Sequence, residues 1–370
     1  MNDSYIVYLC SDLKRVGPTR QTLNIICNAN NSLRNVMVLT LFDEPVNSMK
    51  NSFVQKGIRC ESLRLNRNNL LLAVVKLVAF LKKNKIRFIH SYGVKPDILL
   101  YIVSKFIHVP YVITQRCIPI EDYPVRMQKI VGTVMAKIHM FVLKRAKHVV
   151  ACSKHLHDVM RSDYGFENIT YVQNGVDVDF FAKKDKIKLR RILNLPEQGR
   201  IFVSTGLFLE RKHNDEIIRA FEEMNDEHLF LVMLGDGPLF EFLKKKYSNC
   251  RNIVFCGLVS NVVDYLSASD CFVSASDSEG LPNAVLEALS CGCPVILSKI
   301  PQHKEILEVL PSCGMLFSLH DVENLKECMR LFCLQSTQFG NTAVKLASSP
   351  FTMKAMGMGY RRFYETHFIG

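Results

Sequence analysis

Short apolar runs alternate with longer segments of helical period along this chain, and the alternation restarts halfway. The strand candidates of the first half are residues 5–9, 36–41, 88–90, 111–114, 148–151 and 170–172. Those of the second half are residues 201–204, 229–234, 253–255, 271–274, 294–297 and 315–317. Helical candidates lie between them, such as residues 19–28, 70–83, 215–223 and 283–290. This order predicts an α/β fold with parallel sheets and crossover helices.

The two halves meet at residues 174–186, which read NGVDVDFFAKKDK, a turn signal followed by a lysine-rich stretch. The chain's 370 residues are enough for two domains of ordinary size. We therefore predict two doubly wound domains that face each other across a cleft. Ligands of open α/β sheets bind beyond the carboxyl ends of the strands, so the loops at those ends carry the candidate site.

The charge balance predicts an anionic partner. The formal net charge is +12 and the isoelectric point about 9.1, values that fit nucleic acid, an acidic membrane surface or phosphorylated small molecules. The 13 cysteines are scattered without a CxxC pair, which indicates reduced thiols in a cytosolic protein. No apolar run reaches the roughly 18 residues of a membrane span. The N-terminus lacks the basic region of a signal peptide and reads as a first strand.

Residues 277–296, DSEGLPNAVLEALSCGCPVI, begin as a strand-end loop and continue as a helix. Pro282 suits the first helical turn, where its missing N–H costs nothing. The backbone N–H groups of Gly280, Leu281 and Asn283 then point toward the predicted cleft. Together with the helix dipole they form an anion site.

Two carboxylates stand eight residues apart in this stretch, Glu279 before the helix and Glu287 inside it. Each can bind hydroxyl groups on one side of the anion, and an anion flanked by two polyols describes a nucleotide sugar. The alternative is an ordinary helix N-terminal charge at Glu279 and a solvated Glu287.

A second strand-end loop, residues 204–214, reads STGLFLERKHN and carries the adjacent cations Arg211 and Lys212. Two neighbouring cations can neutralise a diphosphate. The alternative is a solvated basic loop. Residues 231–239, LVMLGDGPL, end a third strand in a tight glycine turn.

These motifs carry a family resemblance. The order GLFLERKH, LGDGPL, VFCGLV and SASDSEGLPNAVLEALSCGCPVI resembles the C-terminal half of family 4 glycosyltransferases, and the E-x7-E spacing of Glu279 and Glu287 matches that family's signature. VVACSKHLHDVM and YVQNGVDVDFF resemble the end of its first half. SDLKRVGPTRQTLNII and PIEDYPVRMQK resemble segments of bacterial capsule and lipopolysaccharide members.

The resemblance implies the GT-B architecture. It implies an acceptor-side Rossmann-like domain at residues 1–178, a nucleotide-sugar-binding one at 179–350, and a C-terminal helix, 351–370, that crosses back to the first domain. The implied activity is retaining transfer of a hexosyl or N-acetylhexosaminyl group from a nucleotide diphosphate sugar, with UDP slightly favoured. The implied acceptor is a hydroxyl of a surface glycan that is lipid-linked. Neither metal nor cofactor is expected.

The resemblance also implies roles for single residues. It places Lys212 on the donor β-phosphate, Glu279 on hydroxyls of the donor sugar and Glu287 on the ribose. The catalytic candidates are therefore Lys212, Glu279 and Arg211. The donor-binding candidates are Gly17, Leu258, Gly280, Leu281, Asn283 and Glu287, with the base read near Leu258 and the phosphates or acceptor approached by Gly17.

Two positions depart from the family pattern. Leu207 stands where the family often has an arginine, and Arg211 is the candidate to supply that charge. Thr114-Gln115-Arg116-Cys117 stands where many members have a histidine near the donor sugar. Arg116, with His90 at the end of another first-half strand, is an acceptor-side candidate.

Two other functions stay open. One is a nucleotide-sugar epimerase on the same double-Rossmann plan. The other is a basic nucleic-acid-binding protein, although no helix-turn-helix, zinc pattern or aromatic-interleaved basic run supports it. Asp177 and Asp179 have the D-x-D form of some metal sites but lie in the segment between the two halves.

Residues 124–147, PVRMQKIVGTVMAKIHMFVLKRAK, hold six cations, no acidic residue and an apolar stripe at helical spacing. The stripe comprises Ile130, Val131, Val134, Met135, Ile138, Phe141 and Val142. One interpretation is a core-facing helix with a basic solvent side. The other is a helix that rests on an anionic membrane, which would place this cytoplasmic protein at the inner face of the cytoplasmic membrane.

Overall fold

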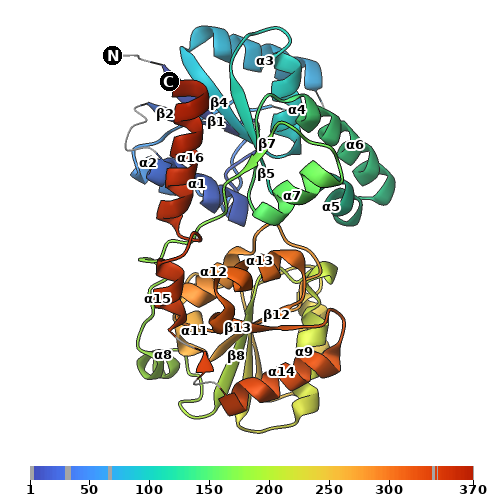
Figure 1. Cartoon of the computed structure of the whole chain (residues 1–370), viewed down its shortest axis with the longest axis vertical. Coiled ribbons are helices and arrows are strands. Elements are labelled where there is room, and N and C mark those ends of the chain that lie inside the picture. Colours follow the sequence, from blue (N-terminus) through green and yellow to red (C-terminus); the bar gives the residue numbers. More distant parts are fainter. Residues whose placement is uncertain (1–3, 30–34, 66–68, 336–337, 340, 370) are drawn as a thin grey trace. The chain divides into compact units, whose positions relative to one another are not determined.

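The computed structural model describes residues 4–29, 35–65, 69–335, 338–339 and 341–369 (Figure 1). The chain divides into two compact units. Unit 1 comprises Met1–Asn174 and Met353–Gly370, and unit 2 comprises Gly175–Thr352. Each unit contains one parallel sheet with helices around it, which confirms the predicted α/β class.

The sheet of unit 1 has seven strands in the order β3-β2-β1-β4-β5-β6-β7. They are β1 Tyr5–Cys10, β2 Val36–Thr40, β3 Arg59–Ser62, β4 Ile86–Tyr92, β5 Tyr111–Gln115, β6 Val149–Ala151 and β7 Ile169–Tyr171. Its helices are α1 Gly17–Ala29, α2 Lys50–Gln55, α3 Leu70–Lys83, α4 Val94–Val103, α5 Pro119–Arg126, α6 Lys129–Arg145, α7 Lys154–Ser162 and α16 Met353–Tyr364. All pairs are parallel, and the reversal of strand order at β1 makes the sheet doubly wound.

The last helix, α16, belongs to unit 1 although the chain reaches it only after completing unit 2. It lies beside α1 (Figure 1), so closely that a Cβ on Gly357 would stand 2.3 Å from the Cβ of Asn28. Its Tyr364 reaches the sheet, where the hydroxyl lies 2.9 Å from that of Tyr8. The predicted return of the C-terminal helix to the first half is therefore confirmed.

The sheet of unit 2 has six strands in the order β10-β9-β8-β11-β12-β13, again all parallel. They are β8 Arg200–Thr205, β9 Leu229–Leu234, β10 Ile253–Gly257, β11 Cys271–Ser274, β12 Val295–Ser298 and β13 Gly314–Phe317. The surrounding helices are α8 Lys186–Ile192, α9 Asn214–Met224, α10 Phe240–Lys246, α11 Val262–Ala268, α12 Asn283–Ser290, α13 Pro301–Val309, α14 Val322–Gln335 and α15 Thr342–Ala347. Short 3-10 turns, η2 Glu210–Lys212 and η3 Pro311–Cys313, lie between them.

Helices on both faces bury the central strands of each sheet. Ile201, Phe202 and Val203 of β8 are each 0% exposed, which fits a parallel sheet covered on both sides. All thirteen cysteines are free thiols. Cys291 and Cys293 are buried in a hydrophobic core of unit 2 that also contains Ile201 and Val203. Within the described ranges, every helix is too short or too polar to span a membrane.

Two details differ from the sequence interpretation. The edge strand β3 was not predicted, because its residues Arg-Cys-Glu-Ser lack an apolar run. Residues 124–147 do not form one helix, because α5 ends at Arg126 and α6 begins at Lys129. The two helices pack at Gly132, where a Cβ would stand 2.3 Å from the carbonyl oxygen of Tyr123. Only glycine fits there.

The Asp177-Val178-Asp179 segment forms a turn. The Asp177 carboxylate accepts hydrogen bonds from the backbone N–H of Asp179 at 3.2 Å and of Phe180 at 3.1 Å. A side chain that caps its own turn in this way has a structural reason to be an aspartate.

Candidate active site

The loop after β8 is held by the glycine turn after β9. The N–H of Gly206 donates to the carbonyl of Leu234 at 3.0 Å, and that of Phe208 donates to the carbonyl of Asp236 at 3.0 Å. Gly235 has a φ of 130°, and a Cβ there would stand 1.8 Å from the carbonyl oxygen of Gly206. The Gly-Asp-Gly turn is therefore needed to let the two backbones approach this closely.

Two cations follow this loop on η2 and meet the loop after β11. Lys212 Nζ pairs with the Glu279 carboxylate. Arg211 Nη1 donates to the carbonyl of Ser278 at 2.6 Å and lies 3.7 Å from Glu279 Oε2. The backbone N–H of Asp277 donates to the carbonyl of Arg211 at 3.0 Å. The structure thus brings together all three residues predicted to be catalytic.

These three side chains are largely withdrawn from solvent. Lys212, Arg211 and Glu279 are 19%, 13% and 11% exposed. Burial alone would raise the pKa of Glu279, but the positive charges of Lys212 and Arg211 outweigh it and lower the pKa to about 2. Two cations around one ionised carboxylate leave an excess of one positive charge. Arg211 Nε is buried without a hydrogen-bond partner among the described residues, so this N–H of the guanidinium is available to a ligand.

The same loop leads into α12. Pro282 is the residue immediately before the helix, one position earlier than predicted, and Asn283 is its first residue. The preceding Leu281 is buried. The loop is fixed to the end of β12, where Ser298 Oγ donates to the carbonyl of Ser276 at 2.5 Å. Glu287 lies half-buried one turn into α12.

His303 belongs to this cluster and was missed from the sequence. It lies in the first turn of α13, 0% exposed. Its Nδ1 donates to the carbonyl of Ser298 at 2.8 Å, which leaves Nε2 as a buried acceptor with no hydrogen-bond partner in the described structure. Burial lowers the pKa of His303 to about 4, although the hydrogen bond to Ser298 and the charge of Glu279 oppose this. The sequence feature that could have pointed to His303 is its position six residues after the strand predicted at residues 294–297.

The other predicted donor-binding residues lie at ends of elements. Leu258 follows β10 and is 76% exposed, while Gly280 is half-buried beside Glu279. Gly17 is exposed at the first position of α1 in unit 1.

The two acceptor-side candidates are both in unit 1. His90 is buried, with Nδ1 2.6 Å from the Tyr364 hydroxyl and Nε2 2.6 Å from Thr114 Oγ1. Burial lowers its pKa to about 3. Both ring nitrogens are thus used inside the core, which favours a structural role. Arg116 donates to Asn174 Oδ1 at 3.3 Å, and its Nε has no partner among the described residues.

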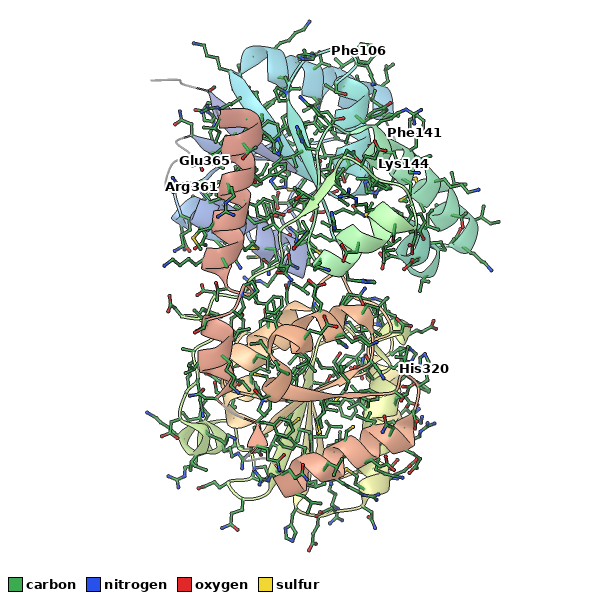
Figure 2. The ribbon with its side chains drawn as sticks, in the orientation of Figure 1. Phe106, Phe141, Lys144, His320, Arg361 and Glu365 are labelled. Atoms are coloured by element: carbon green, nitrogen blue, oxygen red, sulfur yellow. The ribbon has the colours of Figure 1, made fainter. Side chains whose placement is uncertain are left out.

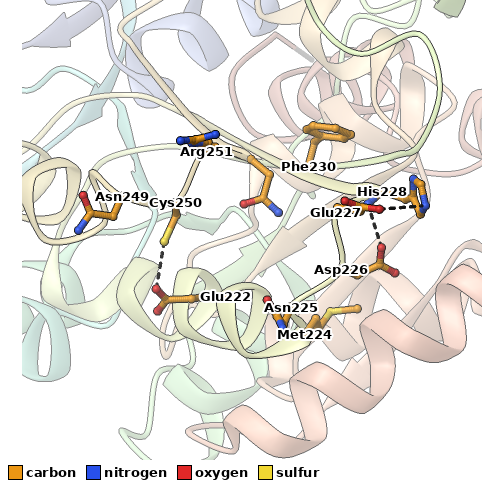
Figure 3. A pocket seen from close by; sticks show the side chains of 11 residues that line it. Glu222, Met224, Asn225, Asp226, Glu227, His228, Phe230, Asn249, Cys250 and Arg251 are labelled. Carbon is orange, nitrogen blue, oxygen red and sulfur yellow. Dashed lines mark hydrogen bonds and ion pairs between the residues drawn. The ribbon is translucent and has the colours of Figure 1, made fainter.

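A shallow cavity of about 1030 Å³ lies elsewhere on unit 2 (Figure 3). It is lined by residues such as Glu222, His228 and Cys250, next to the amino ends of β9 and β10. Ligands of doubly wound sheets bind at the opposite, carboxyl ends, so we do not assign this cavity to the candidate site.

The fold and the matching family models identify a glycosyltransferase of the GT-B type. A model described as Glycosyltransferase Family 4 matches residues 33–180, and one described as Glycosyl transferases group 1 matches residues 185–345. Together the two matches cover most of the chain, which belongs to the family 4 glycosyltransferases.

The sequences of relatives agree with this assignment, and a solved structure agrees with the fold. The chain is 28% identical over 273 residues to UDP-Gal:alpha-D-GlcNAc-diphosphoundecaprenol alpha-1,3-galactosyltransferase of Escherichia coli, covering 68% of this chain and 67% of that one. It is 26% identical over 321 residues to the O-antigen biosynthesis glycosyltransferase WclY of Escherichia coli, covering 82% of each. The crystal structure of Anabaena HepE in complex with UDP superposes with a TM-score of 0.83 at 17% identity, covering 98% of this chain and 100% of that one.

Proposed function

We propose that the protein is a retaining glycosyltransferase. Its donor is a nucleoside diphosphate sugar, with a UDP-sugar favoured, and its acceptor is a lipid-linked glycan. The observation that carries the proposal is the largely buried cluster of Lys212, Arg211 and Glu279, which lies just before the N-terminus of α12. Support also comes from the relatives, since one is named for a UDP-galactose donor and a diphosphoundecaprenol acceptor.

Stabilisation of the departing diphosphate is the main chemical contribution of this cluster. The bond between the anomeric carbon and the phosphate oxygen breaks, and the charge that develops is met by Lys212, Arg211 and the helix N-terminus. The acceptor hydroxyl attacks from the same face and passes its proton to a phosphate oxygen. Glu279 binds sugar hydroxyls as an ionised acceptor, and the buried Nε2 of His303 offers another acceptor next to it. This scheme needs no metal ion.

Glu287→Ala is expected to weaken UDP binding about tenfold or more, because charge-assisted hydrogen bonds to the ribose are worth roughly 1–3 kcal/mol together. Calorimetric titration with UDP measures the loss, and circular dichroism checks the fold. Glu308→Ala is the control, since Glu308 is an exposed glutamate of α13. If Glu287→Ala binds UDP as tightly as the control, Glu287 does not hold the ribose.

An acceptor experiment separates transfer from epimerisation. Consumption of a UDP-sugar should require a membrane extract that supplies acceptor, and the product should keep the anomeric configuration of the donor. Consumption at the same rate without extract favours an epimerase. Stabilisation by oligonucleotides but not by UDP in a thermal-shift assay favours a nucleic-acid-binding protein.

The exposed face of α6 supports the membrane part of the proposal. Five apolar side chains that share this face are exposed to between 41% and 80%: Ile130, Val131, Val134, Ile138 and Phe141. Five of the seven residues of the predicted stripe therefore do not face the core, whereas Val142 is buried and Met135 is half-buried. The buried face is made instead by Gly132, Ala136, His139, Met140, Val142 and Leu143.

A buried polar network fixes which face of α6 points outward. His139 Nε2 lies 3.0 Å from Asp97 Oδ2, and His139 Nδ1 lies 2.7 Å from the Tyr123 hydroxyl. Asp97 also accepts from Ser91 Oγ at 2.5 Å. Asp97, Ser91 and Tyr123 are all buried. The helix therefore cannot rotate to bury its apolar face without breaking the hydrogen bonds of this network.

Positive charges surround the apolar face. Lys137, Lys144 and Arg145 lie on α6, and the helix has no acidic residue. The Arg145 guanidinium stacks 3.8 Å from the ring centroid of Phe141 (Phe141 and Lys144 are labelled in Figure 2). Apolar side chains that enter the lipid boundary and cations that meet anionic headgroups are the features of a helix at a membrane surface.

We expect the protein to float with vesicles that contain anionic lipid and to dissociate at high salt. Exchanging Lys129, Lys137 and Lys144 for glutamate should lower the partition constant by roughly 10²-fold, because each cation near such a surface contributes about 1 kcal/mol. UDP binding should be unchanged. The control exchanges three exposed lysines of unit 2, Lys188, Lys244 and Lys245, with the same change in net charge. An equal decrease of the partition constant in both variants would show that vesicle binding depends on net charge and not on α6.

A further inference from the structure

Three metal-ligating side chains converge on unit 2 outside the Lys212 cluster. His213 follows η2, Glu216 lies in the first turn of α9, and His320, which is labelled in Figure 2, lies between β13 and α14. His213 Nδ1 is 3.2 Å and His320 Nδ1 is 3.0 Å from Glu216 Oε1. One ligand atom from each of the three residues falls within 4.8 Å of the others.

The separations of the two histidine nitrogens from Glu216 fit a small tetrahedral ion. Imidazole nitrogens and carboxylate oxygens lie about 2.0–2.2 Å from zinc, which places neighbouring ligand atoms roughly 3.3 Å apart. The two distances to Glu216 are within a few tenths of an ångström of that value. Three protein ligands also match sites in which water completes the tetrahedron.

The hydrogen-bond pattern of His213 points the same way. Its Nδ1 faces the Glu216 carboxylate, and its Nε2 lies 3.2 Å from Asp277 Oδ2. A neutral imidazole has one N–H and cannot donate to both carboxylates. A metal ion on Nδ1 resolves the conflict, because Nε2–H then donates to Asp277. A carboxylate that orients a ligating histidine in this way is a common partner in zinc sites.

Glu216 supplies a further observation. Its Oε1 contacts both histidines, while its Oε2 is buried with no hydrogen-bond partner among the described residues. We propose that His213, Glu216 and His320 bind a divalent transition-metal ion of the zinc type, with Asp277 orienting His213. Imidazole and carboxylate ligands favour zinc and its neighbours over Mg²⁺ or Ca²⁺.

The site would act on the conformation of the Lys212 loop and not on the transfer step. His213 directly follows Lys212, and Asp277 precedes Glu279 by two residues. A bound ion therefore links η2, α9, the loop after β11 and the loop after β13. This inference does not rest on the proposed donor or acceptor, and it leaves the metal-independent chemistry of Lys212 and Arg211 as it stands.

Titration of the full-length protein with Co²⁺, followed by visible absorption near neutral pH, tests the site. Co²⁺ is chosen because thiolate ligands from the free cysteines would add an intense near-ultraviolet band that imidazole and carboxylate do not. We expect one ion per chain without that band. His320→Ala should weaken binding at least tenfold, and Asp277→Asn by about 10- to 100-fold.

His228→Ala is the matched control. His228 is an exposed histidine 4.0 Å from the Glu227 carboxylate, a pair that lacks a third ligand in the described structure. It should bind Co²⁺ as the wild type does. Equal Co²⁺ affinity in wild type and His320→Ala, or a wild-type spectrum with only the thiolate band, would overturn the proposal. His320 is half exposed, so its removal does not threaten folding.

Discussion

Lys212→Ala is expected to lower turnover at saturating donor by about 10²- to 10³-fold, the loss seen when a preorganised stabiliser of developing charge is removed. Lys212 is only 19% exposed and pairs with Glu279, so its ammonium is held in a protected setting where charge interactions are stronger than in water. As the diphosphate departs, its negative charge grows. The loss should therefore appear mainly in kcat.

Steady-state kinetics with a UDP-sugar separates this role from simple binding. If KM alone rises, Lys212 contributes equally to the bound substrate and the transition state. Lys326→Ala is a suitable control, because Lys326 is 11% exposed and ion-paired with Glu223 and Glu323 in another part of unit 2. Turnover within twofold of the wild type in Lys212→Ala would show that Lys212 is an ordinary loop lysine.

The sequence predicted best where burial alone decides structure. The strands at residues 229–234 and 271–274 were predicted with the bounds they have, because both are short apolar runs buried on both faces of a parallel sheet. The edge strand β3 was invisible because Arg59 and Glu61 point outward and break the apolar pattern. Its strand conformation comes from pairing with β2.

The site was predictable where the chain places charges next to strand ends. Arg211, Lys212 and Glu279 lie in the loops that follow two apolar runs, and the pairing of β8 with β11 brings these loops together. His303 was not predictable in the same way. Its role depends on the hydrogen bond from Nδ1 to the Ser298 carbonyl, which leaves Nε2 buried and unpaired, and no spacing in the sequence reveals that geometry.

The orientation of α6 shows a related limit of pattern analysis. Apolar residues occupy both of its faces, so helical periodicity could not tell which stripe is buried. Packing decides it. Gly132 admits the backbone of α5, and His139 is tied to Asp97 and Tyr123, which turns Ile130, Val134 and Phe141 outward. The sequence alone left two interpretations open, and the exposed apolar side chains of α6 support the one that places this helix at a membrane surface.

The second large effect is expected at Asp270, which holds α8 against the sheet of unit 2. Its Oδ2 accepts from Arg190 Nη2 at 2.6 Å and from the backbone N–H of Ile201 at 2.7 Å, and its Oδ1 accepts from Lys186 at 2.8 Å. Arg190 is 3% exposed and also donates to the carbonyls of Ala268, Glu197 and Gly199. Asp270 is therefore the carboxylate that balances a buried guanidinium.

Asp270→Ala should destabilise unit 2 by about 3–5 kcal/mol, because it leaves that guanidinium buried without its counter-charge. Such a loss is a large part of the 5–15 kcal/mol typical of a folded domain. Hydrogen exchange of the β8 amides measures it, with protection expected to fall by roughly 10²- to 10³-fold. Glu227→Ala, at a 90% exposed acid of the same unit, should change protection little.

A double variant distinguishes uncompensated charge from lost hydrogen bonds. Arg190→Met combined with Asp270→Leu removes both charges and fills their space with apolar atoms, a change that is often neutral or stabilising for a buried ion pair. Here recovery should be only partial, because the Ile201 N–H and three carbonyls lose their partners. Recovery to wild-type protection would mean that these backbone groups contribute little. No recovery at all would locate the whole loss in the hydrogen bonds, and the unbalanced charge of Arg190 would then not be its cause.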